Sequence, residues 1–276
     1  MILRVIMMVF LFNTATLAQE NCLLKMAYKD GDKLPLIAAT PNNSGIYHDV
    51  FNLAAKRIGC ELTISRLPKK RLHVALRKGE LDFYPGASFS VERSEYLLFI
   101  QNGMNDAEYG LTPATVPDIN SFDDVKKYNL VWLMELGSSK FELANRLGIP
   151  TNMVSSVDIF KARRLFAKQR ASFYVVDKGP LLYYPERAGI GPFEQVNLKV
   201  HHNCCGGEYP MYMAFSRSSS HYLEAENPEF DITKPVAPSN QNMYLDESSL
   251  AFKFANELVQ MKAEGVTEDI YQNHFK

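Results

Sequence analysis

Arg93 is the residue whose type and place first suggest chemistry. It is a single arginine in the segment 79–100, GELDFYPGASFSVERSEYLLFI, which otherwise has the apolar character of a buried stretch. A guanidinium group can meet a carboxylate in two parallel hydrogen bonds, so an arginine in a cleft is suited to binding an acidic solute. An ordinary structural role is also open, with Arg93 on a helix surface and paired with Glu92 or Glu95.

Metal binding and catalysis have weaker support in the sequence. The segment HHNCC (201–205) offers four potential metal ligands, but adjacent side chains of an extended segment point to opposite sides. The segment GASFS (86–90) lacks the second glycine of a nucleophile elbow. No phosphate-binding loop, Gly-rich dinucleotide fingerprint or HExxH helix occurs. We therefore predict no catalytic residue, no metal and no cofactor, and favour binding over catalysis.

The first residues have the pattern of a secretory signal. Arg4 precedes an apolar core, residues 5–12, and small or polar residues continue to Ala18, where we predict cleavage. The apolar core is far shorter than the ~20 residues that a membrane-spanning helix needs, and no later segment comes closer. The polar residues before Cys22 do not favour a lipid anchor there. We expect a soluble exported protein, with no segment inserted in the membrane.

The charge balance argues against a nucleic-acid partner. The 276-residue chain has 30 Lys and Arg against 31 Asp and Glu, a formal net charge of −1. Phosphate backbones are held by clustered excess positive charge, which this composition lacks. The basic runs KKR (69–71) and KARRLFAKQR (161–170) are typical of solvated helix faces.

Strands and helices alternate in the first third of the chain. The helical spacing of Ile46, Val50 and Ala54 ends at Gly59, a residue suited to a helix C-terminus. Short apolar or alternating runs are typical of strands. The predicted order is strand 23–28, helix 44–59, strand 61–67, helix 69–79 and strand 81–87. This β-α-β-α-β order predicts a parallel sheet with right-handed crossovers.

The same alternation returns later and predicts a second α/β lobe. Ser139 and Glu142 stand at the spacing of a helix capping box, and Gly148 marks the end of that helix. A strand that follows a basic amphipathic helix ends at Asp177. The predicted later elements are strand 128–135, helix 138–148, helix 156–170, strand 171–177, strand 209–219, a polar stretch 220–247, helix 249–264 and helix 268–274.

Five segments, by their order and spacing, resemble a known family. They are SGIYHDVFNLAAKRIG, LDFYPGASFSVERSEYLLFI, ELGSSKFELA, ASFYVVDKGPLLYY and LAFKFANELVQMKAEGVTEDIYQNHF. The similarity covers nearly all of the chain after the signal segment and is strongest at 45–100 and at the C-terminus. The sequence is therefore similar to the family 3 extracytoplasmic solute-binding proteins, the amino-acid receptors of ABC importers.

This resemblance implies an α/β fold of the two-lobed, type II periplasmic-binding-protein kind, in which each lobe is a mainly parallel sheet flanked by helices. Two crossing segments, 103–107 and 201–205, would join the lobes. Lobe 1 would comprise residues 19–102 plus 206–276, and lobe 2 would comprise residues 108–200. The implied function is a monomeric receptor that closes on a small amino-acid-like or carboxylate solute and delivers it to an ABC permease in the inner membrane.

The resemblance also assigns a binding site. Arg93 falls in the pattern [T/S]-x-[T/S]-x-E-R, whose arginine grips the ligand carboxylate in this family, and Gly86 and Ser88 match with it. Asp177 matches the acid that takes the ligand ammonium, with an N-cap role as the alternative. The expected clamp therefore has a cation on one lobe and an acid on the other.

Four further positions complete the expected site. Ser138 and Ser139 match the loop that opens the first helix of lobe 2, where backbone N–H groups can hold a carboxylate or the side chains can cap the helix. Lys69 stands where the family commonly has an aromatic residue that stacks on the ligand, and Tyr28, followed by Lys29, lies where many members have an acid. A cation at Lys69 would favour a ligand with an additional acid, unless the side chain points to solvent.

The resemblance implies a pairing for two of the four cysteines. In the family's strand order, the strands that follow Cys22 and Cys60 are parallel neighbours, so both cysteines would lie at one end of the sheet within disulfide reach. Cys204 and Cys205 would then lie in or beside the second crossing segment, as free thiols or as a vicinal disulfide. An oxidising compartment permits such bonds.

Two other functions stay open. The protein could be a ligand-sensing subunit that reports to a signalling partner, because the same fold serves in that role. It could also be an enzyme on the same scaffold, a dehydratase or lyase, with Glu135, Glu108 and His48 as candidate acids or bases. Turnover of a bound ligand would separate the enzyme from the two receptor functions.

Overall fold

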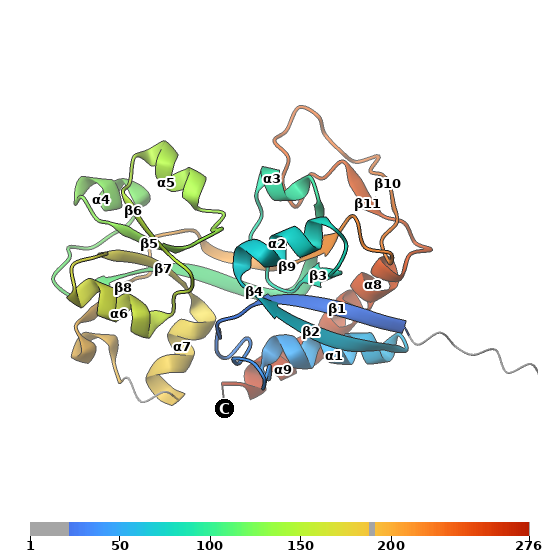
Figure 1. Cartoon of the computed structure of the whole chain (residues 1–276), viewed down its shortest axis with the longest axis horizontal. Coiled ribbons are helices and arrows are strands. Elements are labelled where there is room, and N and C mark those ends of the chain that lie inside the picture. Colours follow the sequence, from blue (N-terminus) through green and yellow to red (C-terminus); the bar gives the residue numbers. More distant parts are fainter. Residues whose placement is uncertain (1–21, 188–190, 276) are drawn as a thin grey trace, which may run out of the picture.

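The computed structural model describes residues 22–187 and 191–275, so the predicted signal segment 1–18 lies outside the described residues. The described chain forms two α/β lobes that lie side by side (Figure 1). Each lobe has hydrophobic cores of its own. In this part of the chain, no helix has the length and apolar character needed to cross a bilayer.

The first lobe begins with the alternation that the sequence predicts. Its first elements are β1 (Cys22–Lys29), α1 (Ile46–Arg57), β2 (Cys60–Leu67), α2 (Lys69–Arg77) and β3 (Phe83–Tyr84). β1 lies between β2 and β3 and is parallel to both, which confirms the predicted parallel arrangement. The helical spacing of Ile46, Val50 and Ala54 buries all three in one core with Phe83 of β3.

The last part of the chain returns to the first lobe. Its elements are β10 (Glu224–Glu226), β11 (Met243–Leu245), α8 (Leu250–Ala263) and α9 (Val266–Asn273). Ser249 caps α8, and Phe254 and Leu258 are fully buried in the core that α1 also fills. The polar stretch 220–247 is not entirely irregular, because β10 and β11 pair as a small antiparallel sheet.

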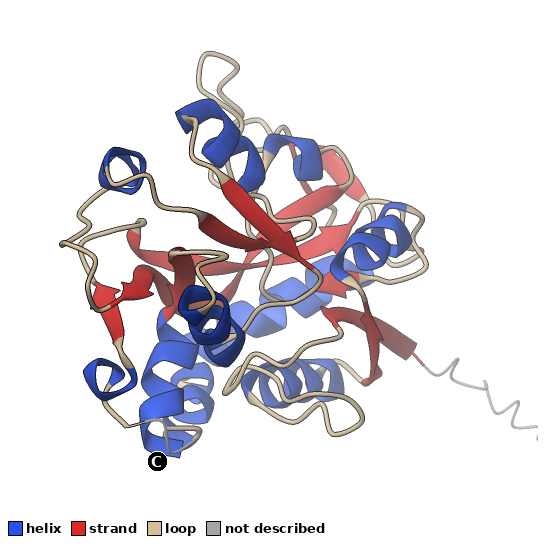
Figure 2. Cartoon of the chain, turned by 60° about the vertical axis from the view of Figure 1, so that its left-hand side comes forward, coloured by secondary structure: helices blue, strands red, loops and turns tan. Residues whose placement is uncertain are grey.

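The middle of the chain forms the second lobe, in which helices again flank the strands (Figure 2). Its elements are α4 (Phe122–Lys127), β5 (Trp132–Glu135), α5 (Phe141–Leu147), β6 (Thr151–Val154), α6 (Ile159–Ala167), β7 (Phe173–Asp177), α7 (Lys178–Arg187), the 3-10 helix η1 (Phe193–Val196) and β8 (Leu198–His201). β5 is parallel to β6 and β7. Trp132 and Leu133 fill two different cores, because neighbouring strand side chains point to opposite faces.

Two long strands run through both lobes. β4 (Leu97–Pro113) and β9 (Gly207–Ser216) are antiparallel partners with one register shift midway. β4 also pairs with β7 and β8, whereas β9 also pairs with β3, so the sheets of the two lobes join in the order β2-β1-β3-β9-β4-β7-β5-β6. Hinges at 103–107 and 201–205, and the lobe boundaries drawn from them, stay a prediction.

The sequence prediction contained no helix at α4 and no strand at β6 or β8, and two further local features of the second lobe also differ from it. Its first strand begins at Trp132 and not at residue 128, because α4 ends there and Asn129 takes a left-handed φ of 51°. The capping box expected from Ser139 is absent. Lys140 holds the N-cap position of α5 with no side-chain hydrogen bond, because a turn precedes the helix there.

All four cysteines are bonded. Cys22 and Cys60 face each other in the parallel register of β1 and β2 and form the predicted disulfide, with a Cα–Cα distance of 4.5 Å. Cys204 and Cys205, for which free thiols were the alternative, form a vicinal disulfide. That second bond lies in the core of the second lobe with Trp132.

Candidate functional site

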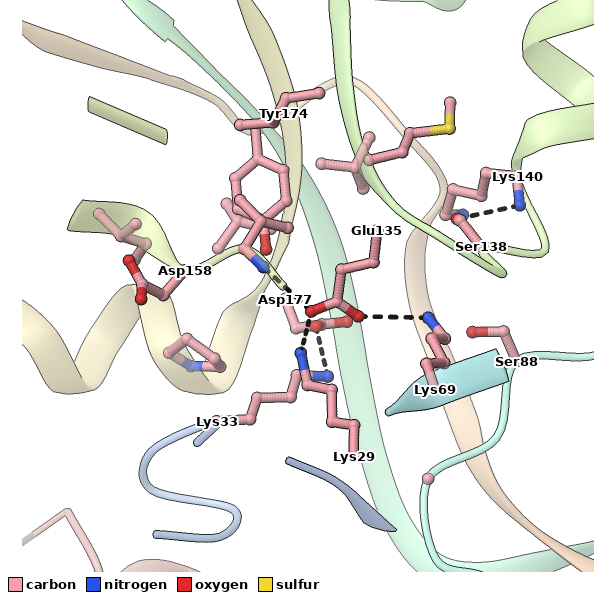
Figure 3. A pocket seen from close by; sticks show the side chains of 18 of the residues that line it. Lys29, Lys33, Lys69, Ser88, Glu135, Ser138, Lys140, Asp158, Tyr174 and Asp177 are labelled. Atoms are coloured by element: carbon pink, nitrogen blue, oxygen red, sulfur yellow. Dashed lines mark hydrogen bonds and ion pairs between the residues drawn. The ribbon is translucent and has the colours of Figure 1, made fainter. Parts of the chain in front are cut away.

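Three hollows lie between the lobes and share lining residues. The central cavity, about 130 Å³, is lined mainly by Lys29, Lys33, Lys69, Glu135, Tyr174 and Asp177 (Figure 3). The strand-side cavity, about 370 Å³, is lined mainly by Lys33, Asp106, Glu108, Lys140, Asp177 and Tyr209. The outer groove, about 590 Å³, is lined mainly by Lys69, His73, Arg77, Arg93, Ser138 and Ser139.

The predicted binding residues all line these hollows, but not the same one. Those at the central cavity are Tyr28, Lys69, Gly86, Ser88, Ser138 and Asp177. Ser139 lines the strand-side cavity and the outer groove. Arg93 lines only the outer groove of the three, so the structure does not bring it into one hollow with Asp177.

The carboxyl ends of parallel strands bring the cavity side chains together. β1 ends at Lys29, β5 ends at Glu135 and β7 ends at Asp177. In open α/β sheets, ligands bind in the crevice at this edge. Lys29 and Glu135 come into contact across 106 residues of sequence, so the fold and not the local sequence assembles the site.

Glu135 is the centre of an ion-pair group that joins the lobes. Its side chain is 7% exposed, and its carboxylate lies 2.5 Å from the Lys29 Nζ and 3.5 Å from the Lys69 Nζ. The same carboxylate accepts the Val157 N–H at 3.1 Å. Burial by itself would raise the pKa of Glu135, but the Lys29 and Lys69 ammonium groups outweigh it and hold the pKa below its usual value.

Lys69 points into the central cavity and not to solvent. Its side chain is 18% exposed and approaches Glu135 (Figure 3). Burial lowers the pKa of Lys69 to about 8, although the Glu135 carboxylate offsets part of this effect. The position that commonly holds a stacking aromatic residue in the family that the sequence resembles therefore holds a half-buried lysine.

Asp177 pairs with a lysine of the first lobe. The Lys33 Nζ forms an ion pair with Asp177 Oδ2, and the Tyr209 hydroxyl donates to Oδ1 at 3.4 Å. Burial would raise the pKa of Asp177, but the Lys33 ammonium outweighs it and lowers that pKa. The acid at the end of β7 therefore acts as an interlobe ion-pair partner in this structure.

The strand-side cavity gathers three carboxylates. Glu108 and Asp177 face each other in the register of β4 and β7, and Lys140 Nζ lies 2.5 Å from Glu108 Oε2. Asp106 is 4% exposed and accepts one hydrogen bond from the N–H of Ala107. Burial, followed by the Asp177 carboxylate, raises the pKa of Asp106 to about 7.

Asp106→Asn is expected to stabilise the protein more at high pH than at low pH. The usual pKa of 3.8 applies in the unfolded chain, so the folded chain holds the Asp106 proton more tightly and loses stability as the pH rises from about 4 to about 7. The amide variant does not titrate and escapes this loss. Urea unfolding of both proteins at about pH 5 and about pH 8 measures the difference. A difference that stays the same at both pH values would contradict the raised pKa.

Arg93 spans the two lobes. It lies in the short helix α3 (Val91–Ser94) and is 5% exposed. Its guanidinium donates to the Ser88 carbonyl in the first lobe and to the Gly137 carbonyl in the second, both at 2.8 Å. The alternative that Arg93 is an exposed helix residue paired with a neighbouring glutamate is wrong, because the side chain is buried against both lobes.

Gly86 is required by close packing at the cavity wall. A Cβ atom added there would lie 2.0 Å from the Tyr47 hydroxyl oxygen, so no larger residue fits without a shift of the ring. The Tyr47 hydroxyl is buried and has no hydrogen-bond partner among the described residues. The Tyr47 ring therefore restricts this position to glycine, a steric constraint that no sequence pattern indicated.

Three cavity lysines were not predicted from the sequence. Lys29 carried a signal, because it ends a strand whose carboxyl end faces the cleft. Lys140 carried a weaker one, because it follows the predicted Ser138 and Ser139 loop. No sequence pattern indicated Lys33, because it lies in an irregular segment after β1. It meets Asp177 only through the packing of the two lobes.

The three residues proposed as acids or bases of an enzyme do not line the same hollow. Glu135 lines the central cavity and Glu108 lines the strand-side cavity, and each is paired with lysine. His48 lies on α1, contacts Asp49 and lines none of the three hollows.

The side chains of the HHNCC segment, proposed above as potential metal ligands, make contacts within the chain. His201 Nδ1 accepts the Ile119 N–H at 3.1 Å, and His201 Nε2 lies 2.8 Å from the Thr112 hydroxyl. Cys204 and Cys205 are bonded to each other. Within residues 22–187 and 191–275, no three His, Cys, Asp or Glu side chains lie where they could hold a metal ion together.

The sequence of the whole described chain matches a known family. The model of the bacterial extracellular solute-binding proteins, family 3, matches residues 26–276. The chain belongs to this family. This result confirms the resemblance drawn from the sequence motifs. No curated protein matches the family 3 chain.

Solved structures share the fold of this family 3 protein at low identity. The substrate-binding protein of an amino acid ABC transporter is 16% identical, with 92% of this chain and 99% of that chain covered and a TM-score of 0.63. A histidine kinase sensor domain with similarity to periplasmic binding proteins is also 16% identical, with 92% and 96% covered and a TM-score of 0.66. The ancestral amino acid-binding protein AncCDT-1, a precursor of cyclohexadienyl dehydratase, is 19% identical, with 92% and 95% covered and a TM-score of 0.64. These likenesses confirm the predicted two-lobed, periplasmic-binding-protein-like α/β fold.

Proposed function

We propose that the protein is a periplasmic receptor that captures a small amino-acid-like or carboxylate solute between its lobes and delivers it to an ABC importer. The observation that carries this proposal is the charged central cavity, to which both lobes contribute side chains. A solute held there contacts both lobes at once and therefore favours their closed arrangement. The cavity, about 130 Å³, is below the ~300 to 1,000 Å³ of drug-sized sites, which favours a small solute.

Arg93 is the proposed carboxylate-binding group. Its guanidinium has five N–H donors, and the carbonyls of Ser88 and Gly137 accept from two of its nitrogens. The remaining N–H groups, with the hydroxyls of Ser138 and Ser139, can meet a carboxylate at the boundary of the outer groove and the central cavity. A solute bound in this way would join the same two lobes that Arg93 already bridges.

The proposed location and partners follow from the family. An extracellular solute-binding family supports export, cleavage near Ala18 and delivery by a monomer to a membrane permease. The alternative role, a sensing subunit for a signalling partner, draws support from the likeness to a histidine kinase sensor domain. Co-purification of the exported protein with permease subunits, or with a membrane kinase, separates the two roles.

A thermal-shift screen against amino acids and small carboxylates tests the proposed binding. A ligand that binds only the folded state is expected to add about 2.7 kcal/mol of stability at a hundredfold excess over its dissociation constant. Small-angle scattering with and without the best ligand measures closure of the lobes. Absence of a shift with every solute would contradict the receptor function. Mass spectrometry of the bound solute after prolonged incubation would reveal turnover and favour an enzyme.

A further inference from the structure

Three acids of the cavities have lysine partners within the chain. Glu135 pairs with Lys29 and Lys69, Glu108 pairs with Lys140, and Asp177 pairs with Lys33. These carboxylates are therefore neutralised by ammonium groups of the protein itself. A cationic group on a solute would have to displace one of these lysines before it could pair with Glu135, Glu108 or Asp177.

Lys33 is the lysine whose place bears most directly on a solute. It lines both the central cavity and the strand-side cavity, and its side chain is 21% exposed. Its Nζ reaches Asp177 from an irregular segment of the first lobe, whereas Lys29 is fixed at the end of a strand. Figure 3 shows the Lys33 and Asp177 side chains meeting beside the Glu135 group.

The backbone around Lys33 supports a fixed position for its side chain. The Lys33 N–H donates to the Ile37 carbonyl at 2.9 Å, and the Ile37 N–H donates to the Lys33 carbonyl at 3.0 Å. Ile37 is fully buried in the core of the first lobe. The loop is therefore attached to the core at the residue that carries the ammonium group.

Asp106, a further acid of the strand-side cavity, is only partly ionised at neutral pH. Burial and the neighbouring Asp177 raise the pKa of Asp106 to about 7, so much of it is protonated at neutral pH. The lysines, in contrast, place several ammonium groups around the central cavity. A carboxylate on a solute finds donors there without displacing a cation.

We propose that Lys33 is a specificity-determining residue: its ammonium occupies the place beside Asp177 that the α-ammonium of an amino acid would need, so the protein selects small carboxylates that lack an α-amino group. This inference rests on the proposed receptor function and names the class of solute. Dicarboxylates suit the site best, because one carboxylate can meet Arg93 in the outer groove and the other can meet the lysines of the adjoining central cavity.

Matched solutes that differ only in the amino group test the proposal. The pairs are succinate with L-aspartate, glutarate with L-glutamate, and propionate with L-alanine. Calorimetry on the full mature protein is expected to give tighter binding of the member without the amino group by about tenfold or more, equal to ~1.4 kcal/mol. Lys33→Met frees Asp177 while keeping the length of the side chain, and is expected to reverse this preference.

Two further variants make the test decisive. Lys199→Met removes a lysine from an ion pair with Asp118 outside the three hollows and is expected to keep the wild-type preference. Lys33→Met combined with Asp177→Asn also removes the carboxylate that the single variant leaves without its lysine, and serves if the single variant does not fold. The double variant is expected to bind both members of each pair within about threefold of each other.

The possible outcomes distinguish a failure of the Lys33 proposal from a failure of the proposed receptor function. Tighter wild-type binding of the amino acids, or an unchanged preference in Lys33→Met or in the double variant, would overturn the role of Lys33 and leave the receptor function standing. Failure of all six solutes to bind the wild type and the variants would overturn both the carboxylate class and the proposed receptor function for such solutes.

Discussion

Replacing Glu135 with alanine is expected to lower the free energy of unfolding by about 3 to 5 kcal/mol, the usual loss when one partner of a buried ion pair is removed. The Glu135 carboxylate is 7% exposed and pairs with the Lys29 and Lys69 ammonium groups. Without it, two cations face each other in a largely buried place, and the Val157 N–H loses its acceptor. Urea unfolding followed by circular dichroism measures the change.

Glu80→Ala is the matched control for this prediction. Glu80 also pairs with a lysine, Lys78, at 3.7 Å, but its side chain is 60% exposed, and exposed pairs contribute only ~0 to 1 kcal/mol. Glu135→Gln keeps an acceptor for the Val157 N–H and removes only the charge, so its loss should lie between the two. Equal urea midpoints for Glu135→Ala and Glu80→Ala would show that the lysine pairs do not stabilise the fold.

Arg93→Ala is expected to weaken the binding of a carboxylate solute by about thirtyfold to several thousandfold, which corresponds to ~2 to 5 kcal/mol. The guanidinium is buried and holds the carbonyls of Ser88 and Gly137 at 2.8 Å, so its removal takes away both a bridge between lobes and the proposed carboxylate donor. Calorimetry with the carboxylate that gives the largest thermal shift measures the affinity.

Two companion variants identify the cause of that loss. Arg93→Lys keeps the charge but not the planar fork, so it should recover only part of the affinity. Arg57→Ala removes an arginine that pairs with Glu257 and Glu264 away from the cavities, and should leave the affinity unchanged. If Arg93→Ala binds within about threefold of the wild type, Arg93 joins the lobes without holding the solute.

Much of the order of the elements could be predicted because its signals are local, although β4, α4, β6 and β8 were not among the predicted elements. The helical spacing of Ile46, Val50 and Ala54, and the glycine at residue 59, specify α1 within one stretch of chain. The strand that ends at Asp177 was found in the same way. The Cys22–Cys60 bond also followed, once the family resemblance had placed β1 beside β2.

The candidate site could be predicted only in part. The family resemblance, together with the rule that ligands bind at the carboxyl ends of parallel strands, predicted that Ser88 and Asp177 lie at the cavity, and both line it. The contacts that the site residues make with the rest of the chain could not be predicted from the sequence. Arg93 contacts Gly137 in the other lobe, and Gly86 is required by a tyrosine ring from α1.

The sequence by itself determined the two α/β lobes, because hydrophobic periodicity and turn residues act over a few neighbouring positions, and the resemblance of its motifs indicated the family. Only the tertiary structure decided that β4 and β9 run through both lobes and that Lys33 meets Asp177. That ion pair joins side chains from different lobes, and its geometry depends on how two separately folded cores pack together. No local pattern of residues encodes such a distance, so the charges that decide what the cleft accepts became visible only in the folded chain.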